Sequence, residues 1–380
     1  MADPAPNVPP ESFIFDRFDG MKNTIQRERM TPRDLVSATN IDLDDAGQAH
    51  RRRGFTQKVA GNCHSLWTTQ QGVVLGVVNG MLSVIQPNYS TVELTVVGDN
   101  PATGVSPLAY AQVGQTVYFS GCADRGTIDL QSLTAGPWGS STDLWLSPVV
   151  NPTATLPAIR GQLLGQPPNA TALAYYNGRI YLAADNVLWA TELYAYNYVD
   201  RVAAHRMFEA PITMLGAVGD GVYVGTEEGV WFLDGPNYPT MKRRPVMDCG
   251  VIPGSMVAIP AELGNPPQVP LSSDTPVQVA LMFMTTGGAC VASNGGQAVN
   301  LTESKFWFPT AQSAAAMFRR QDGMNQYVAS MQSGGDPQNN AAIGDFVEAT
   351  IIRGAASGAW TPATDTLTLG DTLSFVYRPV

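Results

Sequence analysis

The sequence predicts an all-β protein that folds as a β-propeller, most simply with six blades. Three observations support this prediction: a repeated hairpin pattern, many turn-forming residues, and few helical patterns. The 380 residues include 37 glycines and 28 prolines, so turns are frequent and the strands between them must be short. A chain of this length can bury a substantial core.

The hairpin pattern consists of two apolar runs joined by a tight turn. Asn-Gly and Asp-Gly are the strongest short-range signals for such a turn. The clear copies span 75–85 around Asn79-Gly80, 172–183 around Asn177-Gly178, and 214–225 around Asp220-Gly221. Looser copies span 108–120, 281–293 and 316–330. Because a single hairpin is marginal in water, we expect the six to stack radially and bury one another's faces.

Two of the clear copies continue into a third strand. The turn Glu227-Glu228-Gly229 leads into the apolar run 230–233, and Asp185-Asn186 leads into 187–190. The repeating unit is therefore a strand, a tight turn, a strand with small residues, a second turn, and a strand with an aromatic residue. A propeller blade has this order, because its inner strands need small residues near the axis and its outer strands carry bulky ones.

Six turn glycines mark the six units: Gly80, Gly114, Gly178, Gly221, Gly288 and Gly323. Their spacings of 34, 64, 43, 67 and 35 residues are irregular, whereas a WD-type array holds about 40 to 45. We expect the two wide gaps to contain long loops, at 131–170 and 252–276, and one of them could conceal a seventh blade. A β-sandwich is the alternative that the same strand signals allow.

The two ends of the chain are expected to flank one domain. Residues 1–16 are Pro-rich and predict an extended N-terminal arm that a partner would order. Residues 17–380 are predicted to form a single propeller, closed by pairing of the C-terminal strand 372–378 with an N-terminal strand at 55–59. Helix is scarce: 31–36 could open a short turn with Thr31 at its N-cap, and 310–319 could form another.

Composition and charge limit the function classes. Hydrophobic residues make up 44% of the chain and only 14% are charged, so uncharged polar side chains must cover much of the surface. The formal net charge of -10 argues against a sequence-reading nucleic-acid binder, although it is compatible with a conduit past which DNA slides. No run reaches the roughly 20 apolar residues of a membrane span, and the N-terminus lacks the pattern of a signal peptide.

Motifs for catalysis, cofactors and metals are missing from the sequence. Only three histidines occur, none beside a nucleophile motif, and there is no phosphate-binding loop or dinucleotide fingerprint. The cysteines Cys63, Cys122, Cys249 and Cys290 are scattered, which is typical of buried reduced thiols in a protein made in the cytoplasm. We therefore predict a non-enzymatic protein without a cofactor, and we name no catalytic or metal-binding residue.

Two acidic groups require a separate interpretation. Asp220, Glu227, Glu228 and Asp234 gather in one predicted blade, but they occupy positions typical of turns. The run 40–47 has the spaced carboxylates of a calcium loop, which needs Gly at its sixth position and Glu at its twelfth. Asp45 and Arg51 stand there instead, so a polar hairpin turn is preferred and calcium binding remains the alternative.

Three basic clusters stand out in this acidic chain. They are Arg51-Arg52-Arg53, Lys242-Arg243-Arg244 and the pair Arg319-Arg320. One interpretation is that they are solvated or face a partner, and pair there with acidic neighbours. The other is that the two triplets form positive points that touch DNA phosphates weakly once several subunits assemble.

Two segments resemble the virion proteins of tailed bacteriophages. The first contains Phe18-Asp19-Gly20-Met21-Lys22-Asn23, then Asn40-Ile41-Asp42 with Gly47, and then Arg52-Arg53-Gly54-Phe55. It is similar to an opening in which "G-x-N", "N-x-D-(x)n-G" and "R-x-G" precede the first blade. The second runs from Asn177 to Gly235. The chain thus resembles the tail hub and nozzle proteins of short-tailed phages, including the phage DNA-stabilisation proteins.

This resemblance implies a structural component of the virion tail that assembles in the host cytoplasm. Such proteins form a ring, usually a hexamer, below the portal and adaptor proteins, where it provides a channel for DNA ejection and a platform for tail fibres. The expected partners are other copies of the chain, the portal and adaptor, fibre proteins and, transiently, DNA. The alternative is a glycan- or receptor-binding propeller at the tail, since seven Trp and thirteen Tyr could stack on sugars.

Overall fold

A computed structural model describes residues 17–22, 24, 29–36, 41–43, 46–51, 56–96, 107–139, 143–146, 162–260, 279–303, 305, 311–321, 324–332, 351–352 and 372–377. Across these ranges the protein is all-β and contains no α-helix. The predicted arm at 1–16 lies outside the described residues.

The first three blades follow one another along the chain, and each is built on four antiparallel strands, to which the second blade adds a fifth, parallel strand. The first contains β5 (Cys63–Thr68), β6 (Val74–Val78), β7 (Met81–Ile85) and β8 (Thr91–Glu93). The second contains β10 (Ala109–Val113), β11 (Thr116–Ser120), β12 (Arg125–Asp129) and β13 (Thr134–Gly136), with β9 (Thr95–Val96) parallel to β13. The third contains β16 (Ala172–Tyr176), β17 (Arg179–Ala184), β18 (Val187–Ala190) and β20 (His205–Met207).

The next three blades repeat the arrangement. The fourth contains β21 (Ile212–Val218), β22 (Gly221–Thr226), β23 (Val230–Asp234) and β24 (Lys242–Met247). The fifth contains β25 (Val257–Pro260), β26 (Val279–Thr285), β27 (Gly288–Ser293) and β28 (Gln297–Asn300). The sixth contains β29 (Ser313–Gln321), β30 (Met324–Gln332), β32 (Thr372–Tyr377) and β31 (Ile351–Ile352).

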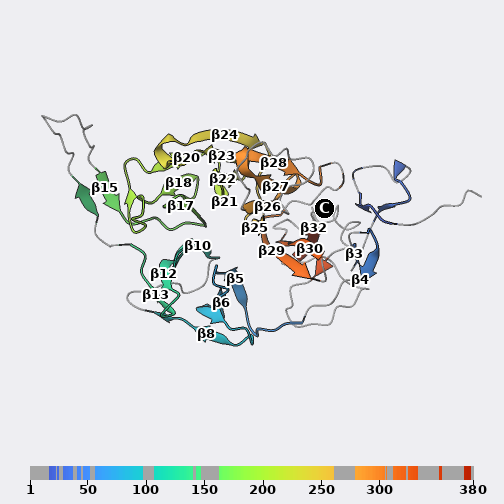
Figure 1. The fold of residues 1–380 in the computed structure, drawn as a ribbon, viewed down its shortest axis with the longest axis horizontal. Helices are drawn as coiled ribbons and strands as arrows, with labels where there is room; N and C mark the ends of the chain where they lie inside the picture. The colour runs from blue at the N-terminus through green and yellow to red at the C-terminus, as the bar shows by residue number, and fades with distance from the viewer. Residues whose placement is uncertain are drawn as a thin grey trace, which may run out of the picture.

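These sheets are arranged as a β-propeller (Figure 1). The first strands of the blades, such as β5, β10, β21 and β29, lie around a common centre, and the last strands β8, β13, β24 and β28 lie farther out. The fold class predicted from the repeated hairpin is therefore confirmed. Within the described residues no seventh sheet of this kind occurs.

The middle strands are buried because a neighbouring blade covers each of their faces. Every residue of β22 and β27 is buried, and both strands consist mainly of small and β-branched residues. The outer strand β24 is exposed over its first four residues. Apolar middle strands and polar outer strands are the expected result of sheets that pack face to face around an axis.

Consecutive blades share apolar clusters. From the first junction to the fifth, representative pairs are Leu75 with Phe119, Tyr118 with Leu182, Tyr181 with Leu215, Phe232 with Phe283, and Met284 with Tyr327. Full burial of such a side chain stabilises the folded state by about 1.5–3 kcal/mol. The stability of the ring therefore depends mainly on the contacts between blades.

The irregular spacing of the turn glycines has a simple structural cause. Gly114 and Gly178 lie at the first turn of their blades, whereas Gly80 and Gly288 lie at the second turn. The two wide gaps are not loops alone. The gap at 131–170 contains β13 and two further strands, and the gap at 252–276 contains β25, the first strand of the fifth blade.

Two predictions for the last blade were wrong. The C-terminal strand β32 pairs with β30 and β31 rather than with 55–59, and residues 56–59 form no strand. The first blade is already complete within 63–93, so it offers no position for a C-terminal strand. Residues 313–321 are the strand β29 and not a helix, because Ala314, Ala316 and Phe318 alternate onto the core with a period of two.

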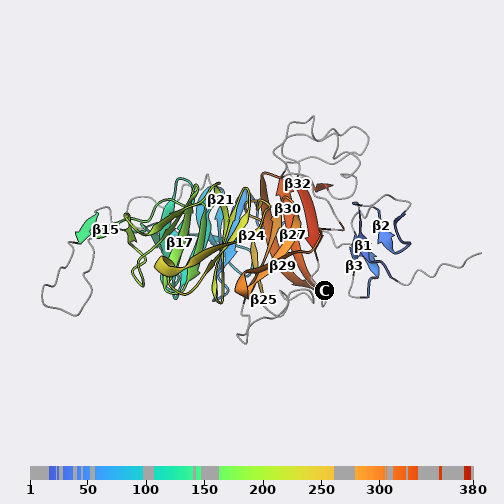
Figure 2. The same ribbon diagram turned by 90° about the horizontal axis from the view of Figure 1, so that it is seen from above.

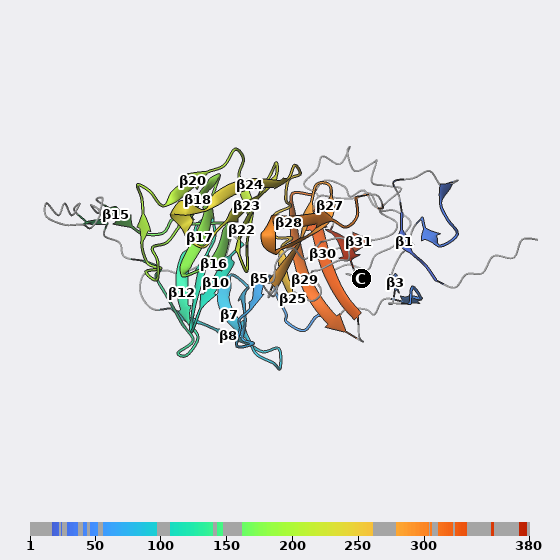
Figure 3. The ribbon, with the colours of Figure 1, turned by 45° about the horizontal axis from the view of Figure 1, so that its top comes forward.

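Three small sheets lie outside the ring. The sheet of β14 (Leu144–Leu146), β15 (Gln162–Gly165) and β19 (Val199–Asp200) projects beyond the third blade, at the left of Figures 1 and 2. The sheets of β1 (Gly20–Met21) with β2 (Asp34–Leu35), and of β3 (Ile41–Leu43) with β4 (Ala49–Arg51), lie at the opposite side, beyond the sixth blade (Figure 3). Thr31 was expected at the N-cap of a short helical turn over 31–36. Instead it donates its backbone N–H and its hydroxyl to the Asp34 carboxylate, in a turn that precedes β2.

A matched pair of methionines tests whether stability depends on the junctions between blades. Met284 is fully buried between the fifth and sixth blades, whereas Met317 is 54% exposed on β29. We expect Met284→Ala to lower the free energy of unfolding by about 2–5 kcal/mol through a core cavity, and Met317→Ala by about 0.5 kcal/mol or less. Denaturant unfolding of both variants measures this, and equal losses would contradict the interpretation.

Buried tyrosines predict a loss of stability at alkaline pH. Burial raises the pKa of Tyr181 to about 12 from its ordinary value of 10.0, and it also raises the pKa of Tyr238 and Tyr223. Between pH 10 and 12 the unfolded chain loses these protons while the folded chain keeps them, so stability falls as pH rises. The urea midpoint should decrease from about pH 9 to 11, and less steeply in Tyr181→Phe. A midpoint that does not change would contradict the burial of these hydroxyls.

Candidate interaction surface

The basic triplet Lys242-Arg243-Arg244 begins β24, the outermost strand of the fourth blade. Arg243 and Arg244 pair with Leu233 and Phe232 of β23, and Lys242 pairs with Asp234. All three residues are exposed. The triplet therefore lies on the periphery of the propeller and not at its axis (Figure 1).

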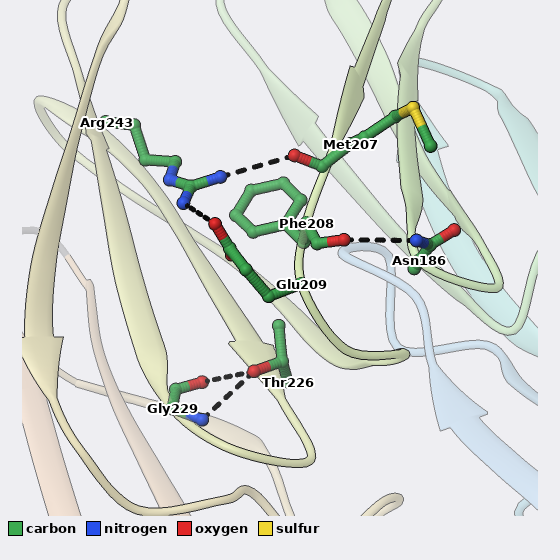
Figure 4. A network of polar contacts seen from close by, with 7 residues as sticks. All are labelled: Asn186, Met207, Phe208, Glu209, Thr226, Gly229 and Arg243. Atoms are coloured by element: carbon green, nitrogen blue, oxygen red, sulfur yellow. Dashed lines mark hydrogen bonds and ion pairs between the residues drawn. The ribbon is translucent and has the colours of Figure 1, made fainter.

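Arg243 connects the fourth blade to the third. Its guanidinium lies 4.0 Å from the ring centroid of Trp231 and 5.0 Å from that of Phe208. It donates to the Met207 carbonyl oxygen at 3.2 Å and to the Glu209 carboxylate (Figure 4). This hydrogen bond from Arg243 lowers the pKa of Glu209.

Two other arginines connect blades in the same way. Arg244 lies over the ring of Phe232 and donates to the Gly295 carbonyl oxygen of the fifth blade. Arg206, on β20 of the third blade, donates to the carbonyl oxygens of Met241 at 2.8 Å and Tyr238 at 2.6 Å. Two of the predicted phosphate-contacting residues thus have partners within the chain. Among the described contacts, the Lys242 side chain has no such partner.

The other basic residues lie on different sheets. Arg51 is exposed at the end of β4, and Arg52 and Arg53 lie outside the described residues. Arg319 forms an ion pair with Asp42 at 3.3 Å, which connects β29 to the N-terminal strand β3. The structure therefore does not bring the described members of the two triplets together within one subunit.

The acidic groups belong to turns and a hairpin. Asp220 follows β21 and accepts the Gly295 N–H at 2.7 Å, whereas Glu227 and Glu228 lie at the opposite end of β22. Asp42 lies in the β3–β4 hairpin, which confirms the interpretation as a polar hairpin. Within the described part of the chain, no group of three or more His, Cys, Asp or Glu side chains is placed to hold a metal ion. No helix of that part is long and apolar enough to cross a membrane.

The sequence reasoning did not identify an exposed aromatic surface around the sheet β14–β15–β19. Exposed large hydrophobic side chains lie on β14 (Leu144, Trp145 and Leu146) and on the loops that lead into and out of β19 (Leu193, Tyr194 and Val202), where Tyr194 lies against Gly178 of the third blade. Trp145 is 58% exposed and Tyr194 is 72% exposed. Large aromatic side chains in such positions are typical of surfaces that bind a ligand or a partner.

Edge-to-face ring contacts hold the loop before β19 in place. Tyr196 makes edge-to-face contacts with Tyr118 and Tyr175, at centroid distances of 5.7 Å and 6.1 Å. The indole N–H of Trp138 donates to the Tyr196 carbonyl oxygen at 2.9 Å. Burial, together with a hydrogen bond between Tyr196 and Tyr175, raises the pKa of Tyr196 to about 12. The loop before β19 is thereby held against the second and third blades.

Two arginines lie beside the aromatic surface. Arg201 pairs with Asp143 at 3.5 Å, and Arg125 donates to the side-chain oxygens of Gln166 and Asn169. Burial and the positive charge of Arg201 lower the pKa of Arg125. The surface thus combines aromatic rings with guanidinium and amide groups. The only sequence signal that could have pointed to this surface is the presence of Trp138 and Trp145 in a gap predicted to be a loop.

Arg243 is predicted to stabilise the propeller more than its neighbour Lys242. Arg243→Ala removes the contacts to Trp231 and Phe208 as well as the hydrogen bond to Met207, so we expect a loss of about 1–2 kcal/mol in the free energy of unfolding. Lys242→Ala should change it by about 0.5 kcal/mol or less. Chemical denaturation compares the two variants. If both behave as wild type, Arg243 does not hold the blades together.

Comparisons with known proteins show similarity only among solved structures. No family model matches the chain, and no curated protein matches it. The extracellular domain of a putative hybrid two-component system from B. thetaiotaomicron matches with a TM-score of 0.41 and 11% identity, over 85% of this chain and 46% of that one. The N-terminal domain of Nup159 matches with a TM-score of 0.37 and 8% identity, over 83% of this chain and 96% of that one. The chain spans less than half the length of the first three matching structures.

Proposed function

We propose that this propeller is a non-enzymatic structural subunit of a phage tail, and that it assembles through its N-terminal segment. One observation carries the proposal. The described residues within 17–51, a segment whose sequence resembles the opening of phage virion proteins, lie beside the last blade instead of forming part of the ring (Figures 1 and 2). A segment in this position is available to a neighbouring subunit.

The described sheets of this segment are too small to be stable alone. The sheet β1–β2 has two residues in each strand, and the hairpin β3–β4 has three. A two-stranded sheet is marginal in water even when it is longer. Strand addition from a second chain would complete such sheets, and this is a common mode of assembly.

One ion pair lies inside the segment and another attaches it to the sixth blade. Lys22 pairs with the buried Asp34 at 2.7 Å inside the segment. Asp42 and Arg319, whose side chains are 8% and 16% exposed, attach the hairpin to β29. Buried charge pairs are weak sources of net stability but can specify one arrangement over others. Here they would orient the segment toward the next subunit.

In the assembled tail we propose a ring of copies below the portal and adaptor proteins, with fibres attached outside it. DNA would pass through the ring and touch it weakly. The basic residues for that contact are Arg51, Arg52, Arg53 and Lys242, since Arg243 and Arg244 have partners between the blades. An acidic surface elsewhere would keep the DNA from adhering.

Assembly is predicted to depend on Asp42. Asp42→Asn removes the charge that holds Arg319, so it should reduce ring formation at least tenfold in apparent affinity while the propeller stays folded. Asp19→Asn, at an exposed residue of the same segment, is the matched control. Sedimentation and negative-stain images of the full chain, alone and with a portal ring, measure assembly. A wild-type chain that stays monomeric in both cases and is absent from virions would overturn the proposal.

Glycan or receptor binding is the second candidate function. The exposed aromatic surface around β14–β15–β19 favours it, because sugars stack on aromatic rings while polar neighbours bond their hydroxyls. Arg201, Gln166 and Asn169 could supply such bonds. This function is compatible with a position at the tail.

Two exposed tyrosines make a matched test of glycan binding. Tyr194 and Tyr89 both have positive φ and are 72% and 53% exposed, but Tyr89 belongs to the first blade. On a glycan array, Tyr194→Ala should lower any saturable signal about tenfold, and Tyr89→Ala should leave it unchanged. An array without saturable signal would exclude this candidate for the glycans tested.

A further inference from the structure

Two cysteines meet at the junction of the fourth and fifth blades. Cys249 lies in the link between β24 and β25, and Cys290 lies on β27. The link is held against the end of β26, where Thr286 donates to the Gly250 carbonyl oxygen at 2.9 Å and Ile252 donates to that of Met284 at 2.9 Å. The backbone on both sides of the pair is therefore fixed.

Cys249 lies against the turn that joins β26 to β27: its Cβ is 3.9 Å from the position that a Cβ on Gly287 would take, and Cys290 follows that turn on β27. The Thr285 hydroxyl, at the end of β26, lies 3.5 Å from the Cys290 sulfur, so both cysteines adjoin the same turn. Cys290 is completely buried, whereas Cys249 is partly accessible to solvent. The pair thus has one sulfur that a small reagent in solution can reach and one that is shielded from solvent.

The surroundings of the pair make the accessible sulfur the better nucleophile. The interaction of the two thiols lowers the pKa of Cys249 and, together with burial, raises the pKa of Cys290. The thiolate is the reactive form of cysteine. The two other cysteines, Cys63 and Cys122, belong to the first and second blades and lie far along the chain from this pair.

We propose that Cys249 and Cys290 form a thiol pair that a peroxide oxidises to an intramolecular disulfide. The Cys249 thiolate attacks one peroxide oxygen, which breaks the O–O bond, releases hydroxide and leaves a sulfenic acid. Cys290 then attacks the Cys249 sulfur, an S–S bond forms, and the sulfenic oxygen departs as water after taking up a proton. Two thiols and one hydrogen peroxide give one disulfide and two waters.

The disulfide would connect the link between two blades to the middle of the fifth blade. It would close a loop of about 40 residues that contains β25 and β26, which restricts the unfolded chain. A chain that folds in a reducing compartment would carry free thiols, and transfer to an oxidising one would lock this junction. The inference does not depend on the proposed tail function.

Peptide mapping of the full chain tests the proposal. After treatment with equimolar hydrogen peroxide and alkylation of free thiols, we expect a peptide with Cys249 joined to Cys290 and a rise in Tm of about 5 °C that a reductant reverses. In Cys290→Ser the sulfenic acid at Cys249 should persist and react with dimedone, and no rise in Tm should occur. Cys122→Ser is the control and should behave as wild type.

Two results would overturn the proposal. One is a wild-type chain in which Cys290 remains free for alkylation after unfolding, although Cys249 has been oxidised. The other is a wild-type chain in which Cys249 is joined to Cys122, Cys63 or a second chain. Both are read from the wild-type protein, so the test holds even if a variant does not fold.

Discussion

Tyr223, Phe232 and Phe283 are completely buried between the fourth and fifth blades, and the other described junctions contain comparable sets of side chains. Apolar contact between adjacent sheets is the interaction on which the rest of this structure depends. A single four-stranded sheet with two apolar faces would not be stable in water, whereas two neighbours cover both faces. The small side chains of β22 and β27 allow the close approach that this packing needs.

Polar side chains add specificity at the edges of the same junctions. Tyr223 donates its hydroxyl to a carbonyl oxygen of the fifth blade, and Arg206 and Arg243 bond to backbone carbonyls of the adjacent blade. A guanidinium suits this position because its planar face stacks on an aromatic ring while its N–H groups reach carbonyl oxygens. The basic residues of the outer strands thus have a structural role. The charge pattern of the sequence alone does not distinguish an arginine that joins two blades from one that contacts phosphate.

Much of the fold could be predicted because its signals are local. The turn at Asn177-Gly178 has positive φ at both residues, as a hairpin of this type requires, and the strands on either side pair as expected. The candidate site could not be predicted in the same way. Trp145 and Tyr194 lie far apart in sequence, and both belong to elements around the sheet β14–β15–β19, whose strands come from 144–146, 162–165 and 199–200. No local pattern in the sequence predicts that these three strands form one sheet.

The sequence by itself determined the all-β class, the tight turns and the strands of the repeated hairpin, because turn preference and apolar alternation act over a few residues. Tertiary structure alone decided which strand completes each blade, that β32 joins the sixth sheet, and that Arg243 lies between Trp231 and Phe208. It also brought Cys249 against the turn that precedes Cys290. The physical reason is that these contacts depend on how separate sheets pack around a common axis, and that packing is a property of the whole chain.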